Sequence, residues 1–445
     1  GSSSQGGAGS GASGPAANVA STTGVGTGGG GGSPCSITSA SGHVYYVDQN
    51  APGADDGNPG TKAQPWKTIQ AAGNVVGAGD TVVVEPGTYA GAIFCWDDPH
   101  QGPYSTIAGT SSAPIVIEAD PTAPDGSVVV HSKNAKTAIA LDLEPGCDYV
   151  DLVGFTVQND GTVTKAGVKV SGSQGNRILD MTVDGVGGIG GIFVDGVTDV
   201  LIQGNTVTNT QGSGTRGHGM YLSGSSTNVT VLYNLIHHNQ YVGIHVNGDI
   251  SEGGRGTVVG ATIAGNVIHD NGQNGINCDG IQDSVFVNDV IYDNARNGIE
   301  LYQIDALGGS TGNVVVDCSI DQSNHGSAIE IAPCAYDNQG SAPTPPGCQG
   351  APFDTSTGNV AFDSVLLGAS GATSVVSNAD LSTSHDLTSA SPSPFVDAAH
   401  GDYHLAPGGP GAGTGVASFG GANAPADAGA YDIGAFDFGL VKICP

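Results

Sequence analysis

Gly298-Ile299-Glu300-Leu301-Tyr302 is one copy of a five-residue phrase that occurs eight times within residues 137–332. Each copy has a small residue followed by apolar, variable, apolar and variable residues. The copies begin at Ala138, Gly167, Gly191, Gly219, Gly243, Gly275, Gly298 and Ala328. Alternation with period two predicts a β-strand with one buried and one exposed face. Recurrence every few tens of residues predicts a stack of similar coils, so the whole chain can form one solenoid.

The composition supports an all-β chain with few helices. Glycine accounts for 75 of the 445 residues, and only 12% of the residues are charged. The 11 basic and 41 acidic residues give a net charge of −30. This charge argues against nucleic acid and anionic membranes as partners. It also argues against binding of polyanionic glycans, unless a local basic patch or a bridging Ca²⁺ offsets it. No apolar run is long enough to span a membrane.

The eight cysteines suggest an exported protein in an oxidising compartment. No CxxC pair occurs, which makes a zinc ribbon a poor explanation. Cys334 and Cys348 flank a proline-rich loop and are the pair most readily bridged. Cys278 occupies an apolar position of the repeat and is either a free thiol in the core or bonded to Cys318. Connectivity does not follow from the sequence.

Residues 1–34 consist almost entirely of Gly, Ser, Ala and Thr, the composition of a flexible tether. They resemble the spacer that follows the lipidated cysteine of bacterial surface lipoproteins, although that cysteine is absent. We therefore expect an extracellular or outer-cell-surface location with a lipoprotein-like anchor. Self-association through this glycine-rich segment is a second expectation.

Two further stretches carry a family resemblance. GNPGTKAQPWKTIQAA at residues 57–72 and GAGDTVVVEPGTY at residues 77–89 resemble the opening of secreted bacterial right-handed parallel β-helix proteins of the pectate-lyase-like superfamily. The resemblance implies a short capping helix, here near residues 68–76, and a right-handed coil. DAGAYDIGAFD at residues 427–437 resembles the DxGAYE/F end of such proteins, which implies a C-terminal cap over residues 406–445. The β-helix itself is then expected over residues 35–405. Lyases, epimerases, hydrolases and adhesins share this opening, so it indicates the fold and leaves the function open.

A second strand precedes most copies of the phrase and begins with a polar or small residue. These residues are Gly154, Asp180, Asn205, Asn234, Asn266, Asp289, Asp317 and Asp363. Stacked Asn and Asp side chains pass hydrogen bonds from coil to coil, which predicts a side-chain ladder at one corner. His237, His238 and His269 also precede the phrase in their coils and are expected in a turn or on a second face.

Alignment of the phrases gives two inward columns of aliphatic residues and two outward columns of changing residues. The first outward column reads Ala140, Lys169, Phe193, Tyr221, His245, Asn277, Glu300 and Glu330. The second reads Asp142, Ser171, Asp195, Ser223, Asn247, Asp279, Tyr302 and Ala332. Structural ladders usually repeat one residue type, so columns that change at every coil favour a surface that recognises a ligand.

Three acids of these columns are the catalytic candidates. Glu300 and Glu330 are expected on adjacent coils ~4.8 Å apart, near the ~5–5.5 Å carboxyl separation of retaining glycosidases. Asp279 and Glu300 are diagonal neighbours roughly 8 Å apart, within the ~6.5–9.5 Å range of inverting enzymes. Crowded carboxylates raise one pKa, as a general acid requires. The alternatives are a Ca²⁺ site built from the same three residues or a solvated acidic edge.

The remaining outward residues predict contacts to a sugar chain. Aromatic faces are offered for stacking on sugar rings, and amides, imidazoles and cations are offered to hydroxyl groups. The predicted substrate-binding residues are Phe193, Tyr221, His245, Asn247, Asn277, Tyr302, Arg216 and His218. The leading hypothesis is a surface-anchored protein that binds and cleaves an extracellular polysaccharide, as a hydrolase or a lyase. The alternative is a non-catalytic structural surface protein, such as the subunit of a self-assembling fibre.

Overall fold

The structure is a computed structural model. It describes residues 42–98, 102–249, 255–304, 306–331, 356–375, 379–389, 391–419, 422–423 and 433–435. The glycine-rich segment 1–34, Cys334, Cys348 and most of residues 420–445 lie outside these ranges. The expectations that concern them therefore stay predictions.

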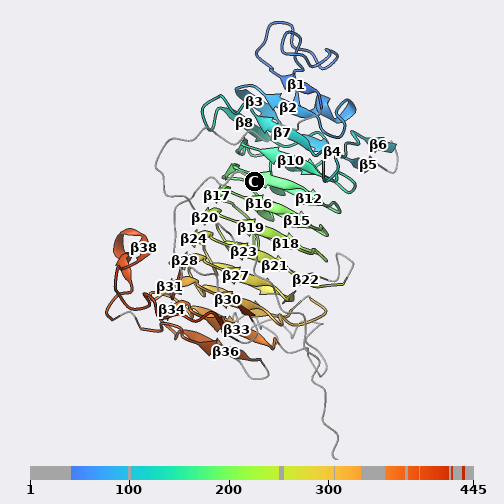
Figure 1. Cartoon of the computed structure of the whole chain (residues 1–445). Coiled ribbons are helices and arrows are strands. Elements are labelled where there is room, and N and C mark those ends of the chain that lie inside the picture. The colour runs from blue at the N-terminus through green and yellow to red at the C-terminus, as the bar shows by residue number, and fades with distance from the viewer. Residues whose placement is uncertain are drawn as a thin grey trace, which may run out of the picture.

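Three long parallel sheets run the length of the described chain and form the sides of a stack of coils (Figure 1). Sheet 1 contains, in spatial order, β1 (Val44–Val47), β2 (Thr81–Val84), β7 (Ile115–Ala119), β10 (Val150–Val153), β13 (Arg177–Leu179), β16 (Leu201–Gln203), β19 (Thr230–Leu232), β23 (Thr262–Ala264), β27 (Val285–Val287), β30 (Val314–Val316), β33 (Asn359–Phe362) and β36 (Leu381–Ser384). Sheet 2 contains β3 (Gly87–Ala90), β8 (Val128–Ser132), β11 (Thr156–Val157), β14 (Thr182–Asp184), β17 (Thr206–Thr208), β20 (Leu235–His237), β24 (Val267–His269), β28 (Val290–Tyr292), β31 (Ser319–Gln322) and β34 (Val365–Gly368). Sheet 3 contains β4 (Ala92–Phe94), β9 (Ile139–Leu143), β12 (Ala166–Ser171), β15 (Gly190–Asp195), β18 (His218–Ser223), β21 (Ile244–Asn247), β25 (Ile276–Asp279), β29 (Ile299–Tyr302), β32 (Ile329–Ile331) and β35 (Thr373–Val375).

Each coil visits the three sheets in turn, as β13, β14 and β15 do, and the next coil lies directly beside it. The predicted all-β parallel β-helix is therefore confirmed. The inward residues of the repeated phrase, such as Ile192 and Val194, are fully buried in one continuous aliphatic core. This core positions the outward side chains of sheet 3 with the spacing of adjacent strands, ~4.8 Å.

The N-terminal cap is shorter than predicted. The segment expected to be a helix near residues 68–76 forms the 3-10 helix η1 (Ile69–Asn74), whose buried residues include Ile69 and Ala72. The four remaining strand pairs are β22 (Val258–Val259) with β26 (Ile281–Gln282), β5 (Trp96–Asp98) with β6 (Gly102–Tyr104), β37 (Phe395–Asp397) with β38 (Asp402–Leu405), and β39 (Ser418–Phe419) with β40 (Ala422–Asn423). A second 3-10 helix, η4 (Ala398–His400), joins β37 to β38.

Described residues of the C-terminal part pack along the side of the stack. Phe395 and Tyr403, from the β37–β38 pair, pack with outward residues of sheet 2 such as Val290 and Val365. Figure 1 shows β38 on the side of the stack that sheet 2 forms. Phe419 packs in the same way on Phe362 of sheet 1. The prediction that residues 406–445 cover the last coil stays a prediction, because most of them are outside the described ranges.

The predicted corner ladder is present between sheets 1 and 2. Asn205 donates from Nδ2 to Oδ1 of Asn234 at 2.9 Å, and Asn234 and Asn266 repeat this bond to Asn266 and Asp289. Asp180, Asp317 and Asp363 were predicted in the same ladder but lie one residue earlier. They have φ near 51°, 52° and 51°, and so form the left-handed turn that precedes the ladder position.

The described chain shows one disulfide that was not predicted and tests one of the two predicted pairs. Cys95 and Cys147 form a disulfide that ties β4 to the turn after β9. Cys278 and Cys318 are both free and buried, so a bond between them is excluded and the alternative of free core thiols is confirmed.

Candidate functional site

The outward columns of sheet 3 align as predicted from the second copy of the phrase onward. Lys169 lies opposite Phe193, followed coil by coil by Tyr221, His245, Asn277, Glu300 and Glu330. The first copy was aligned incorrectly by two residues. Asp142, not Ala140, lies opposite Lys169, and Ala140 belongs to the core. Seven of the eight copies therefore follow the predicted register.

The prediction that these columns are exposed is wrong. Asp279 is 2% exposed, Glu300 and Tyr302 are each 6% exposed, and His245 is 9% exposed. Side chains on adjacent coils begin so close together that each covers its neighbours. Tyr221 and Glu330 are half-buried and give the face its openings to solvent.

The predicted aromatic residues form one cluster on the outer face of β15, β18 and β21. His218 stacks on His245 with ring centroids 4.6 Å apart and planes 9° apart. Tyr221 contacts both imidazoles and also meets the ring of Phe193 edge-on at 5.4 Å. Tyr241, which precedes β21, adds an edge-on contact to His218 at 5.3 Å and was not predicted.

The two histidines of this cluster are neutral at physiological pH. Burial lowers the pKa of His245 to about 4. Burial, and then the charge of His245, lowers the pKa of His218 well below its usual value. Both rings therefore act as aromatic surfaces and hydrogen-bonding groups, and neither supplies positive charge.

Amide side chains connect the aromatic cluster to the acids. Asn247 donates from Nδ2 to the Tyr221 hydroxyl at 2.8 Å, and its buried Oδ1 has no partner in the described chain. Asn277 donates from Nδ2 to the Tyr302 hydroxyl at 2.9 Å and lies 3.3 Å from Nδ1 of His245. Seven of the eight predicted contact residues, all but Arg216, are thus brought together in one network.

Glu300 and Glu330 lie directly opposite each other on β29 and β32, as predicted. Asn274 donates a hydrogen bond to Oε2 of Glu300, and Asn297 donates to Oε2 of Glu330 at 3.1 Å. Burial raises the pKa of Glu300, and the charge of Glu330 raises it further, while Arg296 acts in the opposite direction. One carboxyl group of this pair is therefore suited to carry a proton when the other is ionised.

Asp279 does not join this pair. Its Oδ1 accepts hydrogen bonds from the backbone N–H groups of Ile304 at 2.7 Å and Ala306 at 3.4 Å. Asp279 therefore anchors the turn after β29. The ligand atoms of Asp279, Glu300 and Glu330 do not all lie within 4.8 Å of one another in the described chain, and the Ca²⁺ alternative stays a prediction.

Arg216 differs from the other predicted contact residues because it is exposed. It lies in the turn that leads into β18, whereas His218 at the start of that strand is buried in the aromatic cluster. The described cation whose charge acts on the acid pair is Arg296.

Sequence reasoning missed a second ionic cluster at the other end of sheet 3. Lys169 Nζ lies 2.9 Å from Oε1 of Glu144, and Ser171 donates to the other carboxylate oxygen at 3.2 Å. Asp142 accepts a hydrogen bond from Thr137, and burial together with the charge of Glu144 raises its pKa to about 7. The signal was the single lysine of the outward column, whose partner was hidden by the two-residue error in register.

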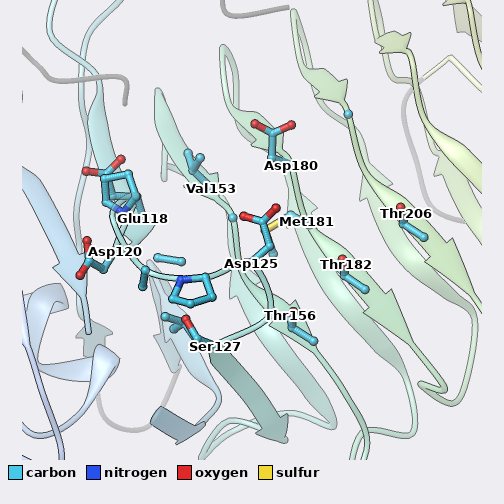
Figure 2. A pocket seen from close by; sticks show the side chains of 18 residues that line it. Glu118, Asp120, Asp125, Ser127, Val153, Thr156, Asp180, Met181, Thr182 and Thr206 are labelled. Atoms are coloured by element: carbon cyan, nitrogen blue, oxygen red, sulfur yellow. The ribbon is translucent and has the colours of Figure 1, made fainter. Parts of the chain in front are cut away.

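A separate hollow lies at the corner between sheets 1 and 2. Figure 2 shows Glu118, Asp120, Asp125 and Asp180 around it, beside threonines of sheet 2, and its volume is about 210 Å³. Glu118 is 2% exposed, and burial followed by the charge of Asp120 raises its pKa to about 7. This hollow was not predicted, and it lies on different sheets from the acid pair.

Comparison with known proteins supports the fold. A family model described as the right handed beta helix region matches residues 155–252. The solved structure of pectate lyase Pel9A has a TM-score of 0.57 and 17% identity, and the match covers 90% of this chain and 98% of that chain. A rhamnogalacturonan lyase has a TM-score of 0.52 and 17% identity, over 79% of this chain and 86% of that chain. No curated protein sequence matches.

The chain therefore has the right-handed parallel β-helix fold, which it shares with these two structures. Identity this low establishes the shared fold and leaves the activity to the site itself. Among the described residues, no helix has the length and apolar character needed to cross a membrane.

Proposed function

We propose that the protein binds an extracellular polysaccharide on the outer face of sheet 3 and cleaves it, with Glu300 and Glu330 as the acid pair. The observation that carries this proposal is the pairing of two carboxyl groups on adjacent strands, each held by an asparagine amide. The polysaccharide lyases that share the fold support a carbohydrate ligand. The Cys95–Cys147 disulfide supports action outside the cell or at its outer surface.

The charge of the site favours a neutral polysaccharide over a polyuronate. His218 and His245 are uncharged, Lys169 is paired with Glu144, and Arg296 already faces an acid. A lyase must neutralise the carboxylate of a uronic acid before it removes the neighbouring proton, and this face offers little positive charge for that step. Hydrolysis of a glycosidic bond requires only an acid and a second carboxylate.

In the proposed reaction, Glu300 is the general acid because its pKa is raised. Its carboxyl proton moves to the glycosidic oxygen as the bond to the anomeric carbon breaks. Glu330, half-buried, attacks the anomeric carbon from the other side and forms a glycosyl ester as that bond breaks. The ionised Glu300 then takes a proton from water, whose oxygen attacks the anomeric carbon, breaks the ester bond and restores the Glu330 carboxylate. Backbones ~4.8 Å apart match the short carboxyl separation of retaining enzymes, so we expect retention of anomeric configuration.

Tyr221 and the aromatic cluster define where the sugar chain lies. The half-buried ring of Tyr221 is fixed by the hydrogen bond from Asn247 and by its edge-on contact with Phe193. A sugar that stacks on Tyr221 is three coils from Glu300, because β21 and β25 lie in succession between β18 and β29. We infer that the glycan runs along the stack, across the strands of sheet 3.

The test is digestion of a panel of neutral and uronic polysaccharides by the whole chain. Glu300→Gln and Glu330→Gln should each lower the rate by about 100- to 10,000-fold, the usual contribution of acid–base catalysis. Glu85→Gln is the matched control, because Glu85 is a partly buried carboxylate of the N-terminal coil that pairs with Lys62 at 3.4 Å. Full activity of Glu300→Gln on every responsive glycan would make this assignment wrong.

The products decide between the reaction classes. New reducing ends without unsaturated sugars indicate hydrolysis, whereas products that absorb in the ultraviolet indicate elimination. The digestion is repeated with added Ca²⁺ and with a chelator. Dependence on Ca²⁺ would favour the lyase alternative.

A second candidate function is a structural surface protein, such as a fibre subunit. The burial of the outer face favours it, because the buried carboxyl groups of Asp279 and Glu300 already accept hydrogen bonds from within the chain. Sedimentation of the full chain against a variant that lacks residues 1–34 tests it. Assembly that requires the glycine-rich segment, without activity on any glycan, would support this function over cleavage.

A further inference from the structure

A histidine-rich cluster lies on the edge of sheet 2, where the chain turns toward sheet 3. His237 and His269 are the last residues of β20 and β24 and lie opposite each other in the register. His238 and Asp270 follow them on adjacent coils, and both adopt left-handed backbone conformations with φ near 54° and 52°. This shared turn points one imidazole and one carboxylate outward beside the two strand histidines.

The strand histidines are held rigidly by ring stacking. His237 stacks on His269 with centroids 5.0 Å apart and planes 4° apart. His269 stacks in turn on Tyr292 at 4.7 Å and 3°, and Tyr403 of β38 continues the column at 4.3 Å. Both faces of His269 are therefore covered, and only its edge is free to bind.

The ligand atoms converge at that edge. Nδ1 of His269 lies 2.7 Å from Oδ2 of Asp270, and Nδ1 of His238 lies 2.8 Å from Nδ1 of His237. The ring of His238 stands at 85° to that of His269, with ring centroids 5.9 Å apart. One ligand atom each from His238, His269 and Asp270 lie within 4.8 Å of one another.

We propose that His238, His269 and Asp270 bind a divalent transition-metal ion of the Zn²⁺ class. Two imidazoles and one carboxylate are a donor set that suits Zn²⁺, and three protein ligands leave a fourth position for water. Ca²⁺ and Mg²⁺ prefer sets of oxygen ligands and fit this group poorly. His238 and Asp270 are exposed, so the ion has direct access from solvent.

The surrounding charge assists the ion. Asp293 and Asp184, from neighbouring coils, act electrostatically on His269 and His237. The hydrogen bonds of the free cluster are exchanged on binding, and the one ring proton of neutral His269 moves by exchange with solvent from Nδ1 to Nε2 as Nδ1 binds the metal. The ion then joins two adjacent coils, and it stabilises the folded chain because it binds that state preferentially.

The test is calorimetric titration of the untagged full chain with ZnCl₂ and, separately, with CaCl₂. Thermal unfolding is measured with and without each metal. We expect one Zn²⁺ per chain, a rise in Tm with Zn²⁺ and neither effect with Ca²⁺. His238→Asn and Asp270→Asn should each weaken Zn²⁺ binding by at least about 10- to 100-fold. Asparagine is suitable because Asn209, in the coil before that of His238, adopts the same left-handed conformation at φ near 55°.

The matched control is His400→Asn. His400 forms the same kind of imidazole–carboxylate pair, with Nδ1 2.8 Å from Oδ2 of Asp397, and both side chains are exposed. It should leave the Zn²⁺ affinity unchanged. The proposal is overturned if wild-type chain binds Zn²⁺ no more tightly than Ca²⁺, or if both His238→Asn and Asp270→Asn bind it as wild type does. These readouts do not involve glycan cleavage, so they are independent of the proposed function.

Discussion

Asp289 is the weak point of the asparagine ladder, and replacing it should stabilise the protein. In this ladder, Asn205, Asn234 and Asn266 each donate from Nδ2 to the next coil and also to a backbone carbonyl of the preceding coil. Asp289 accepts two bonds from Asn266 at Oδ1, but its buried Oδ2 has no partner in the described chain. Burial raises the pKa of Asp289 well above its usual value.

The substitution Asp289→Asn supplies the missing donor. The carbonyls used by the earlier asparagines belong to Ile178, Ile202 and Val231, and the register places Ile263 next in that series. The new amide therefore reaches a carbonyl position that the ladder already uses. One such hydrogen bond contributes about 1 kcal/mol net.

The gain should grow with pH. The pKa of Asp289 is higher in the folded chain than in the unfolded chain, so its contribution to stability is present in acid and is lost as pH rises through the folded value. At pH values above the folded pKa, each unit by which that pKa is raised lowers the stability of the wild type by about 1.4 kcal/mol. Measured from pH ~4 to pH ~8, the difference should be smallest in acid, where a protonated Asp289 is itself a donor, and should increase as pH rises.

Scanning calorimetry across this pH range measures the effect as a difference in Tm between variant and wild type. For a chain longer than 250 residues, about 1.4 kcal/mol corresponds to roughly 2–4 °C or less. Asp283→Asn is the control, because Asp283 is an exposed residue of the same coil. A variant no more stable than wild type near pH ~8, or a gain that is constant with pH, would refute the reasoning.

Three further predictions concern the other buried charges and the disulfide. Glu118→Gln should match the wild type near pH ~4.5 and exceed it above pH ~7 by up to about 3 kcal/mol, because the raised pKa of Glu118 makes its stability contribution disappear over that interval; equal melting curves at every pH would contradict this. Lys169→Met should cost about 3–5 kcal/mol in urea unfolding, because it leaves Glu144 buried without its partner, and adding Glu144→Gln should recover part of the loss; a single variant as stable as wild type would contradict it. Replacing Cys95 and Cys147 by serine should lower the free energy of unfolding by about 4 kcal/mol, because the disulfide closes a loop with a sequence separation of 52 in the unfolded chain. An unchanged Tm would contradict this prediction.

The fold and most of the register were predictable from the sequence because the repeated phrase has one strong period. The aliphatic columns, such as Ile244 to Ile276, fix which face of each strand is buried. A shift of two residues leaves that pattern unchanged, and Ile139-Ala140-Leu141-Asp142-Leu143 is apolar at every odd position. The correct partner of Lys169 was therefore not determined by alternation, and its ion pair with Glu144 could not be found that way.

The corner ladder shows a similar limit. A left-handed turn residue and the ladder residue after it both favour Asn and Asp, for different reasons. In Gly265-Asn266 the glycine takes the turn and the asparagine takes the ladder, whereas in Asp180-Met181 the aspartate takes the turn. The sequence shows a polar residue at the corner but does not distinguish the two adjacent positions.

Exposure was the least predictable property, and it changes which residues of sheet 3 can act. Period-two alternation identifies the side of a strand that faces away from the core, but in a β-helix every outward side chain has neighbours on both adjacent coils. The carboxylate of Asp279 is held by a hydrogen bond from the turn after β29. The carboxylate of Glu330, opposite Glu300, is only half-buried. Exposure therefore separates structural acids from available ones. By this criterion, the exposed pair His238 and Asp270 at the edge of sheet 2 is better placed to meet an external ligand than the buried centre of the aromatic cluster.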